Sequence, residues 1–169
     1  MSVFPTRILL ATDGSEDAEL AARTAADLAE STGSELHVVT VGRAFPSAVY
    51  EVYIEAMSDE LRQEAQRILD EEVRKIEEAA GIVARPHLRM GERRDEAIVH
   101  LAEEIGAGLI VMGSRGLGGL RRALMGSVSD SVVRHAHCPV LVVRHEKEAG
   151  ARWRFWGSDP SSVHHEGPG

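Results

Sequence analysis

A group of glycines and small polar residues in the second half of the chain has the chemistry to hold a phosphate. Gly113-Ser114-Arg115-Gly116 is followed, after nine residues, by Gly126-Ser127-Val128. Glycine permits positive φ angles and lets a ligand approach the backbone closely. If Ser127 opens a helix, the first-turn amides offer unpaired donors at the positive end of the helix dipole, which suits an anion. The sequence therefore predicts a phosphate-binding loop from Gly113 to Ser127.

Two well-known phosphate motifs do not fit this segment. No Gly-Lys-Ser or Gly-Lys-Thr follows the glycines, so the P-loop pattern is absent. Gly116-Leu117-Gly118-Gly119 also lacks the strand-adjacent spacing of the dinucleotide-binding fingerprint. The specificity of the loop must therefore come from the elements that position it.

Short apolar segments alternate with amphipathic ones along the chain. Apolar or β-branched runs bounded by turn residues predict strands, and apolar residues at helical spacing predict helices. The predicted strands are Arg7–Thr12, Glu35–Val41 (ended by Gly42), Val83–Met90, Gly108–Met112 and Val140–Arg144. The first and last predicted helices are Glu16–Ser31 and Ser127–His137. Between them the sequence predicts a long helix between Ser47 and Ala80, with a candidate break near Ser58-Asp59, and a short helix after Gly91 that includes Ala97 to Ile105.

This alternation predicts an α/β fold, a three-layer sandwich with a five-stranded, parallel, doubly wound sheet. Val83–Met90 is expected at a sheet edge, because Pro86 cannot donate to a neighbouring strand. In such sheets ligands bind outside the carboxyl ends of the strands, where the winding reverses. A predicted strand ends at Val41, and two others are followed by Asp13 and Gly113. These three residues are therefore expected together at the carboxyl ends of the strands, where a ligand binds.

Composition narrows the classes of function. With 43% hydrophobic and 27% charged residues the chain is typical of a soluble globular protein, and 4% aromatic residues predict a core of small aliphatic side chains. The net charge of -8 argues against a broad nucleic-acid surface. No segment approaches the roughly 18 apolar residues of a membrane span. The start, Met1 to Arg7, lacks the layout of a secretory signal, and the single cysteine excludes an internal disulfide, so a cytoplasmic protein is expected.

The length of 169 residues fits one domain. This domain is expected to cover residues 1–147. Beyond Lys147 the periodic pattern is lost among Gly, Ser, Pro and His, so residues 148–169 are expected to form a disordered tail.

From about Pro5 to His145 the chain resembles the universal stress protein family, specifically its ATP-binding branch. The resemblance rests on the ATDGS segment after the first strand, the LHVVTV strand, the G-x-x-G, nine residues, G-S-V spacing, and the CPVLVV segment. It implies a Rossmann-like fold of the adenine nucleotide alpha hydrolase type. It also implies ATP as ligand, with Mg²⁺, and a candidate binding set of Ala11, Thr12, Asp13, Val41, Met112, Gly113, Arg115, Gly116, Gly126, Ser127 and Val128.

The resemblance also implies a role for parts of this set. Asp13 would lie near the ribose and adenine, and the backbone of Val41 would contact the adenine edge. The remaining roles fall on the glycine loop, where Gly113 and Gly116 would accommodate ribose and phosphates while Gly126, Ser127 and Val128 hold the phosphates. Ala11 stands where some family members have proline, a difference expected to change little.

Several of these residues have simpler alternative explanations. Asp13 has the right position to cap the first helix, and Gly113 and Gly116 fit a long turn. Arg115, together with Arg121 and Arg122, either adds charge near a γ-phosphate or is simply solvated.

Other titratable residues suggest no catalytic or metal site. His135 and His137 are two residues apart, which does not put them on one helical face, and His164-His165 lie in the tail. Cys138 is expected to be a small buried side chain rather than a nucleophile. The acidic run from Glu60 to Glu78, interleaved with Arg and Lys, is typical of a solvated helix face.

Three functions fit these observations. The first is an ATP-binding regulator of a stress response or of dormancy with at most slow hydrolysis, because an ATPase needs a water-positioning group that the loop does not supply. The second is a slow Mg²⁺-dependent nucleotide hydrolase, in which Ser127 or Asp13 assists. The third is a nucleotide-free interaction protein on the same fold, against which the glycine spacing argues.

Association is a separate expectation. The apolar last strand, Val140 to Arg144, ends the fold and is expected at a sheet edge, which must be covered or paired. A two-fold homodimer through this strand is the simplest solution, and the family resemblance implies the same arrangement.

Overall fold

The computed structural model of the chain describes residues 3–44, 51–116 and 125–144, with the backbone alone for residues 51–56. Strands and helices alternate along these residues. The strands are β1 (Arg7–Ala11), β2 (Glu35–Arg43), β3 (Ala84–Gly91), β4 (Leu109–Gly113) and β5 (Val140–Val143). The helices are α1 (Glu16–Thr32), α2 (Glu51–Ala80), α3 (Arg94–Ile105) and α4 (Ser127–His135). The expected tail, residues 148–169, lies outside the described residues, as do Arg121 and Arg122.

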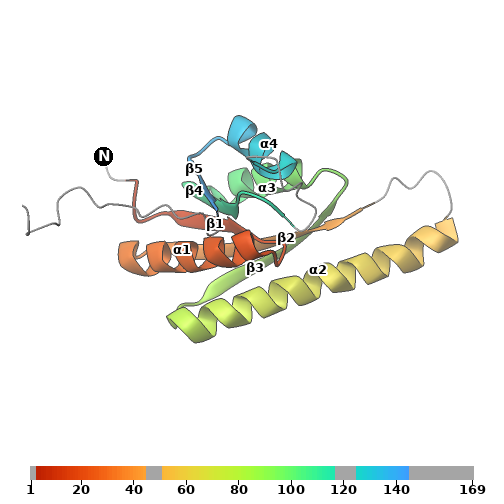
Figure 1. The fold of residues 1–169 in the computed structure, drawn as a ribbon, viewed down its shortest axis with the longest axis horizontal. Helices are drawn as coiled ribbons and strands as arrows, with labels where there is room; N and C mark the ends of the chain where they lie inside the picture. The colour runs from red at the N-terminus through yellow and green to blue at the C-terminus, as the bar shows by residue number, and fades with distance from the viewer. Residues whose placement is uncertain (1–2, 45–50, 117–124, 145–169) are drawn as a thin grey trace, which may run out of the picture.

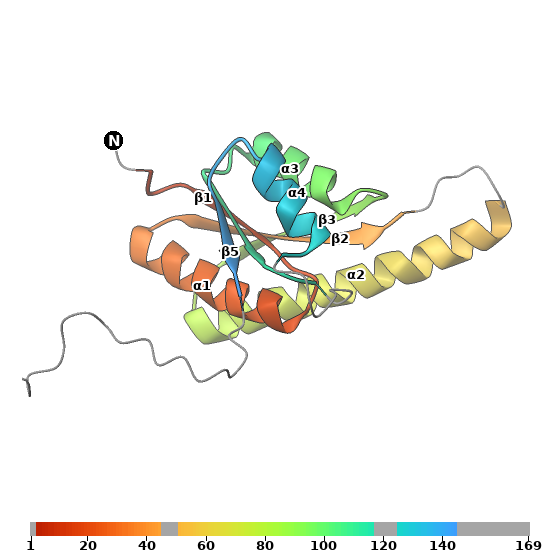
Figure 2. The same cartoon turned by 45° about the horizontal axis from the view of Figure 1, so that its top comes forward.

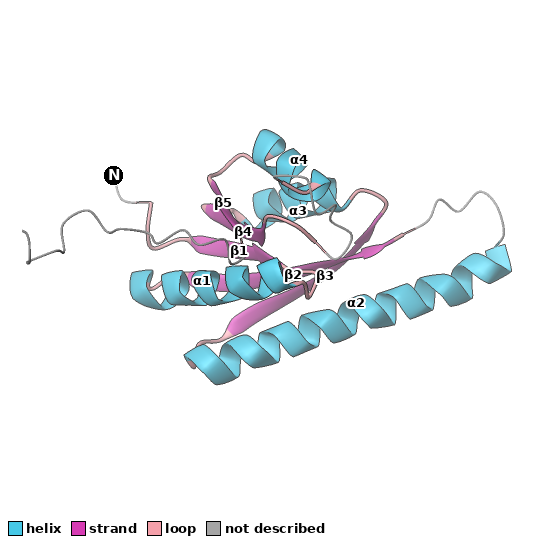
Figure 3. Cartoon of the chain, viewed as in Figure 1, coloured by secondary structure: helices cyan, strands magenta, loops and turns pink. Residues whose placement is uncertain are grey.

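All five strands are parallel and lie in the order β3-β2-β1-β4-β5. Helices α1 and α2 cover one face of the sheet, and α3 and α4 cover the other (Figures 1 and 3). The chain winds from β1 outward to β3 and then crosses back to β4, so the direction of winding reverses between β1 and β4. The predicted three-layer, doubly wound α/β fold is confirmed, and β1 and β4 mark the place where a ligand is expected.

Helix α1 lies close to the sheet because its buried face consists of alanines. These residues, spaced three and four apart, are Ala18, Ala21, Ala22, Ala25, Ala26 and Ala29. The helix begins at the cap Ser15, whose Oγ accepts from the Ala18 amide at 3.3 Å. It ends at Gly33, whose φ of 66° is the left-handed conformation predicted for this position. The small side chains bring the first turn of α1 against the end of β4.

The two edge strands are β3 and β5. Pro86 of β3 is in register with Val38 of β2, and no described strand lies on the other side of β3, so the missing amide of proline is tolerated there. Strand β5 pairs with β4 and leaves Leu141 36% exposed. The predicted edge positions of the third and the last strand are confirmed.

Gly42 was expected to end the second strand, and this expectation is wrong. Strand β2 continues through Gly42 to Arg43, paired with Met90 and Gly91 of β3. A Cβ at Gly42 would collide with the side chain of Met90 and touch that of Ala65. The glycine therefore serves close packing against β3 and α2 rather than a turn.

Several other element bounds also differ from the prediction, most of them by one residue. Helix α2 runs unbroken past Ser58-Asp59 and extends beyond the end of the sheet (Figures 1 and 2). Helix α4 ends at His135 instead of His137, because Ala136 is already extended at φ −65° and ψ 141°. Strand β4 starts at Leu109 and includes Gly113, so the first loop glycine belongs to the strand end.

Two histidines meet on the α3 side of the sheet. His37 of β2 and His87 of β3 have ring nitrogens 2.9 Å apart, and His37 also contacts the Glu35 carboxylate at 3.4 Å. Burial lowers the pKa of both imidazoles below the ordinary value of 6.5, and at His87 the neighbouring His37 lowers it further. Both rings are therefore neutral near pH 7.

This pair predicts acid sensitivity. Between the lowered pKa values of the folded state and about 6.5, the unfolded chain binds more protons than the folded chain, so the free energy of unfolding falls as the pH drops below 6.5. Replacing His87 with Gln should reduce this slope in urea titrations between pH 7 and pH 5. The exposed His100→Gln is the control and should leave the slope unchanged. Equal slopes for wild type and His87→Gln would contradict the prediction.

Candidate functional site

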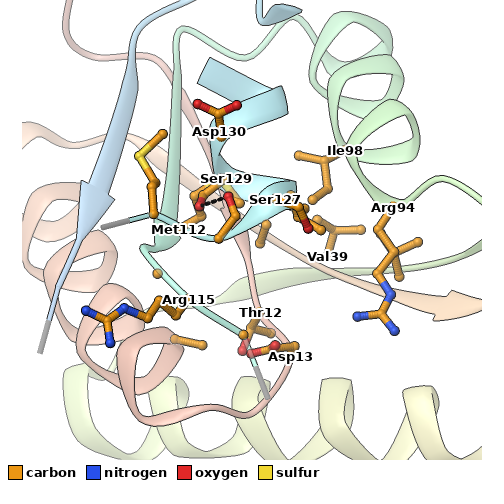
Figure 4. A pocket seen from close by; sticks show the side chains of 18 residues that line it. Thr12, Asp13, Val39, Arg94, Ile98, Met112, Arg115, Ser127, Ser129 and Asp130 are labelled. Atoms are coloured by element: carbon orange, nitrogen blue, oxygen red, sulfur yellow. Dashed lines mark hydrogen bonds between the residues drawn. The ribbon is translucent and has the colours of Figure 1, made fainter. Parts of the chain in front are cut away.

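A pocket of about 550 Å³ opens at the carboxyl ends of β1, β2 and β4, beside the N-terminus of α4 (Figure 4). Its volume lies within the roughly 300 to 1,000 Å³ common for small-molecule sites. It lies outside the carboxyl ends of β1 and β4, between which the winding reverses, and this is where the topology predicts a ligand. The lining residues are Ala11, Thr12, Asp13, Ala18, Val39, Val41, Arg94, Ile98, Met112, Gly113, Arg115, Gly116, Met125, Gly126, Ser127, Val128, Ser129 and Asp130.

Every residue of the candidate binding set predicted from the sequence lines this pocket. Residues from the end of β1, from β2, from the end of β4 and from the start of α4 thus meet around one volume, although they are far apart in the chain.

The turn after β1 is built by hydrogen bonds among its own residues. The Gly14 amide donates to Thr12 Oγ1 at 3.3 Å, and the Ser15 amide donates to Asp13 Oδ1 at 3.1 Å. Ser15, rather than Asp13, caps helix α1. The alternative explanation of Asp13 as the helix cap is therefore wrong, and its carboxylate lines the pocket instead.

Gly113 and Gly116 have packing roles in addition to lining the pocket. A Cβ at Gly113 would lie 2.8 Å from the backbone carbon of Asp17 and 2.9 Å from the Ala18 amide nitrogen. A Cβ at Gly116 would collide with Asp13 Oδ2. Glycine is thus required at Gly113, where β4 meets the backbone of the first turn of α1, whereas a side chain at Gly116 would displace the Asp13 carboxylate. Neither glycine has a positive φ, and residues 117–124 lie outside the described residues, so the long-turn explanation stays a prediction.

Ser114, which is only 1% exposed, connects four elements at the end of β4. Its amide donates to Val143 O of β5 at 2.7 Å, and its hydroxyl donates to Asp17 Oδ2 of α1 at 2.6 Å. Its carbonyl accepts from the Gly126 amide at 2.6 Å and from Ser129 Oγ at 2.8 Å. These bonds fix the position of the α4 N-terminus relative to β4.

The N-terminus of α4 presents backbone donors to the pocket. Its cap residue, Gly126, makes no side-chain capping bond, and the first intrahelical bond runs from the Asp130 amide to Gly126 O at 2.9 Å. Among the described residues, the amides of Ser127, Val128 and Ser129 have no hydrogen-bond acceptor. Unpaired amides at the positive end of a helix dipole form an environment for an anion.

Arg115 lies on the pocket side opposite Arg94 (Figure 4). Its Nε is buried and has no hydrogen-bond partner within the described residues. Its carbonyl accepts from Ser15 Oγ at 3.2 Å, which ties the loop to the cap of α1.

Sequence reasoning missed several lining residues. They are Ala18, Val39, Arg94, Ile98, Met125, Ser129 and Asp130. Arg94 and Ile98 are four residues apart on one face of α3, and Ser129 and Asp130 belong to the first turn of α4. Their positions on the predicted helices could have identified these four residues as candidates from the sequence.

Glu72 departs from the expected solvated face of Glu60 to Glu78. It is 3% exposed, and Thr12 Oγ1 donates to its Oε2 at 3.4 Å. Burial raises the pKa of the Glu72 carboxyl above its usual value. Glu72 therefore supports the Thr12 turn from beneath the pocket, and α2 contributes to the site without lining it.

The described residues hold neither a cluster of three or more metal-ligating side chains nor a helix long and apolar enough to cross a membrane. Cys138 is partly exposed rather than fully buried, and it packs against the core on the α3 and α4 side. Burial raises the pKa of its thiol, which disfavours the reactive thiolate.

The bonds of Ser114 lead to a prediction on stability. Replacing Ser114 with Ala removes the hydroxyl donor to Asp17, so the free energy of unfolding should fall by about 1 to 3 kcal/mol. Urea denaturation would measure the change. The control is Ser31→Ala, where the exposed hydroxyl bonds only to the Leu28 carbonyl, and it should change stability by less than about 0.5 kcal/mol. Equal changes in both variants would contradict the assigned role.

Comparison with known proteins places the chain among its relatives. The family model of the universal stress protein family matches residues 5–144. A relative from Staphylococcus haemolyticus that carries the universal stress protein name is 35% identical over 141 residues, which cover 83% of this chain and 85% of the relative.

Solved structures agree with this result. The universal stress protein UspA from Lactobacillus plantarum is 25% identical with a TM-score of 0.72, covering 83% of this chain and 99% of that one. A universal stress protein in complex with cAMP is 27% identical with a TM-score of 0.64, covering 84% and 98%. The universal stress protein from Archaeoglobus fulgidus in complex with dAMP is 25% identical with a TM-score of 0.61, covering 84% and 99%. The chain belongs to the universal stress protein family.

Proposed function

We propose that this protein binds ATP, together with Mg²⁺, in the pocket at the ends of β1, β2 and β4. Nucleotide occupancy then regulates a stress response or dormancy in the cytoplasm. The observation that carries the proposal is the convergence of the whole predicted binding set on one pocket of suitable size. The cAMP and dAMP complexes of two structural neighbours support an adenine nucleotide as the class of ligand.

The two parts of the pocket suit the two parts of a nucleotide. Apolar side chains, among them Val39, Val41 and Ile98, provide a surface for a flat base. The unpaired amides of the α4 N-terminus provide donors for phosphate oxygens. In this arrangement Asp13 meets the ribose between them.

Mg²⁺ fits the polar residues of the pocket. This ion is typically held by one or two carboxylates together with substrate phosphates and water. Asp13 and Asp130 are the carboxylates among the described lining residues. When bound, the ion would neutralise phosphate charge, which a protein of net charge -8 otherwise repels.

The site is proposed to hold ATP with at most slow hydrolysis. Fast phosphoryl transfer requires an oriented water and a countercharge for the leaving group. Asp130 is bound by the Arg134 guanidinium at 3.0 Å, and one oxygen of Asp13 receives the Ser15 amide. Both carboxylates are thus engaged in structural contacts, which favours a binding role over that of a general base.

Titration calorimetry with ATP and Mg²⁺ tests the proposal, with cAMP and AMP as competing ligands. Ser127→Asp places a negative charge at the α4 N-terminus, where it favours the helix dipole but repels phosphate. This variant should bind ATP at least about tenfold more weakly than wild type and keep its thermal stability. The matched control is the neutral Ser127→Asn, which should lose less affinity.

Three outcomes separate the alternatives. Absence of adenine-nucleotide binding at millimolar ligand would overturn the proposal and favour a nucleotide-free interaction protein. Phosphate release by wild type well above that of Ser127→Asp would instead favour the slow hydrolase. Equal affinities of Ser127→Asp and wild type would show that phosphates do not reach α4.

We further propose that the protein is a homodimer joined through β5. This strand has a free edge within the described residues, and its Leu141 is 36% exposed. An unpaired apolar edge favours pairing with an identical strand around a two-fold axis.

Sedimentation tests the dimer. Wild type should sediment at about twice the chain mass of 18.4 kDa, and Leu141→Arg should shift the protein toward the monomer by placing charges in the interface. The control is Val83→Arg, since Val83 is 80% exposed and precedes β3 at the opposite sheet edge. A wild-type monomer would contradict this proposal.

A further inference from the structure

Two adjacent arginines at the start of α3 have opposite surroundings. Arg93 bonds to Asp95 at 2.7 Å and to Glu96 at 2.8 Å, and its side chain is 60% exposed. The side chain of Arg94 makes no ion pair or hydrogen bond with any described residue, and Arg94 lines the pocket. Acidic partners are thus available next to Arg94 in the chain, but they bind Arg93 instead.

The position of Arg94 is unfavourable for the helix itself. Arg94 is the first residue of α3, where the helix dipole is positive, and the cap residue Arg93 makes no side-chain capping bond. A cation at a helix N-terminus is disfavoured, whereas Asp or Glu would be stabilising there. A residue that opposes local stability without a compensating contact is a candidate for a functional role.

Arg94 belongs to the part of the pocket assigned above to the base. Figure 4 shows it on the α3 side, next to Val39 and Ile98, with Ser127 between it and Arg115. The pairing of Arg43 with Gly91 brings the end of β2 beside the turn that leads into α3. Arg94 therefore lies close to the strand end that carries Val41, away from Arg115.

We propose that Arg94 is a base-contacting residue, whose guanidinium packs on the face of the purine and helps to select nucleotides over simple polyphosphates. A guanidinium is planar, weakly hydrated and stacks well on aromatic rings. A base that enters between Arg94 and the apolar side chains of β2 and α3 would give this cation the partner that the described residues do not provide. The inference rests on the proposed nucleotide function of the same pocket.

A contact with the base can be distinguished from long-range attraction of the phosphates. A cation that only attracts phosphate would strengthen binding of ATP and of inorganic tripolyphosphate alike. A cation that packs on the base would strengthen binding of ATP and of adenosine, and would leave tripolyphosphate unaffected. The three probes therefore separate the two roles.

The test compares Arg94→Met with Arg93→Met in the full chain. Methionine keeps most of the side-chain length and apolar surface while removing the guanidinium. Affinities for ATP and tripolyphosphate come from calorimetry, and the affinity for adenosine comes from competition against ATP. Thermal unfolding checks the fold, and Arg94→Met should be at least as stable as wild type because it removes a cation from the helix N-terminus.

Arg94→Met should weaken ATP and adenosine binding by the same factor, about 2- to 30-fold, and leave tripolyphosphate within twofold of wild type. Arg93→Met should leave all three affinities within twofold. Weakened tripolyphosphate binding with unchanged adenosine binding would overturn the inference and make Arg94 a phosphate ligand. Unchanged affinities for all three probes would overturn it too, while wild-type ATP binding would still support the proposed function. Absence of ATP and adenosine binding to wild type would overturn both.

Discussion

The bonds of one buried serine hold the pocket together. Ser114 uses its amide, carbonyl and hydroxyl to join β4 to β5, α4 and α1. Because a buried polar group without a partner is costly, these bonds allow little movement of any one element alone. The α4 N-terminus therefore keeps its position at the mouth of the pocket. The same residue also links the pocket to β5, the strand through which we propose that the protein dimerises, so the pocket and the edge strand are physically connected.

Close packing of small residues makes this arrangement possible. The alanine face of α1 brings its first turn against β4, where Gly113 leaves no room for a Cβ beside Asp17 and Ala18. A larger helix face would move Asp17 away from the Ser114 hydroxyl. The low aromatic content of the chain, 4%, thus has a structural consequence, because a thin layer between helix and sheet lets polar groups of both reach the same point.

The fold was predictable from the sequence because its signals are local. Alternating apolar and amphipathic segments predict a parallel sheet, and Pro86 predicts an edge strand. The errors arose where a partner is distant in the chain. Gly42 faces Met90, so its role depended on β3, and Glu72 is buried under Thr12 although its charged neighbours suggest a solvated helix face. Helical spacing indicates which residues share a face, but it does not indicate what that face meets. Arg94 was missed for the same reason.

The proposed nucleotide site would let an acidic protein bind an anion. A net charge of -8 repels polyanions at long range, and several exposed cations among the described residues are paired, as Arg74 is with Glu71 and Glu78. The backbone amides of α4 act only over a short distance, and they need no net positive surface. Under this proposal, such a site would disfavour extended phosphate backbones and admit a single small ligand into a shaped cavity. Under the same proposal, selection among small anions would fall to the part of the pocket away from α4, where apolar side chains and the Arg94 guanidinium, which has no partner among the described residues, would favour a ligand that carries a flat ring.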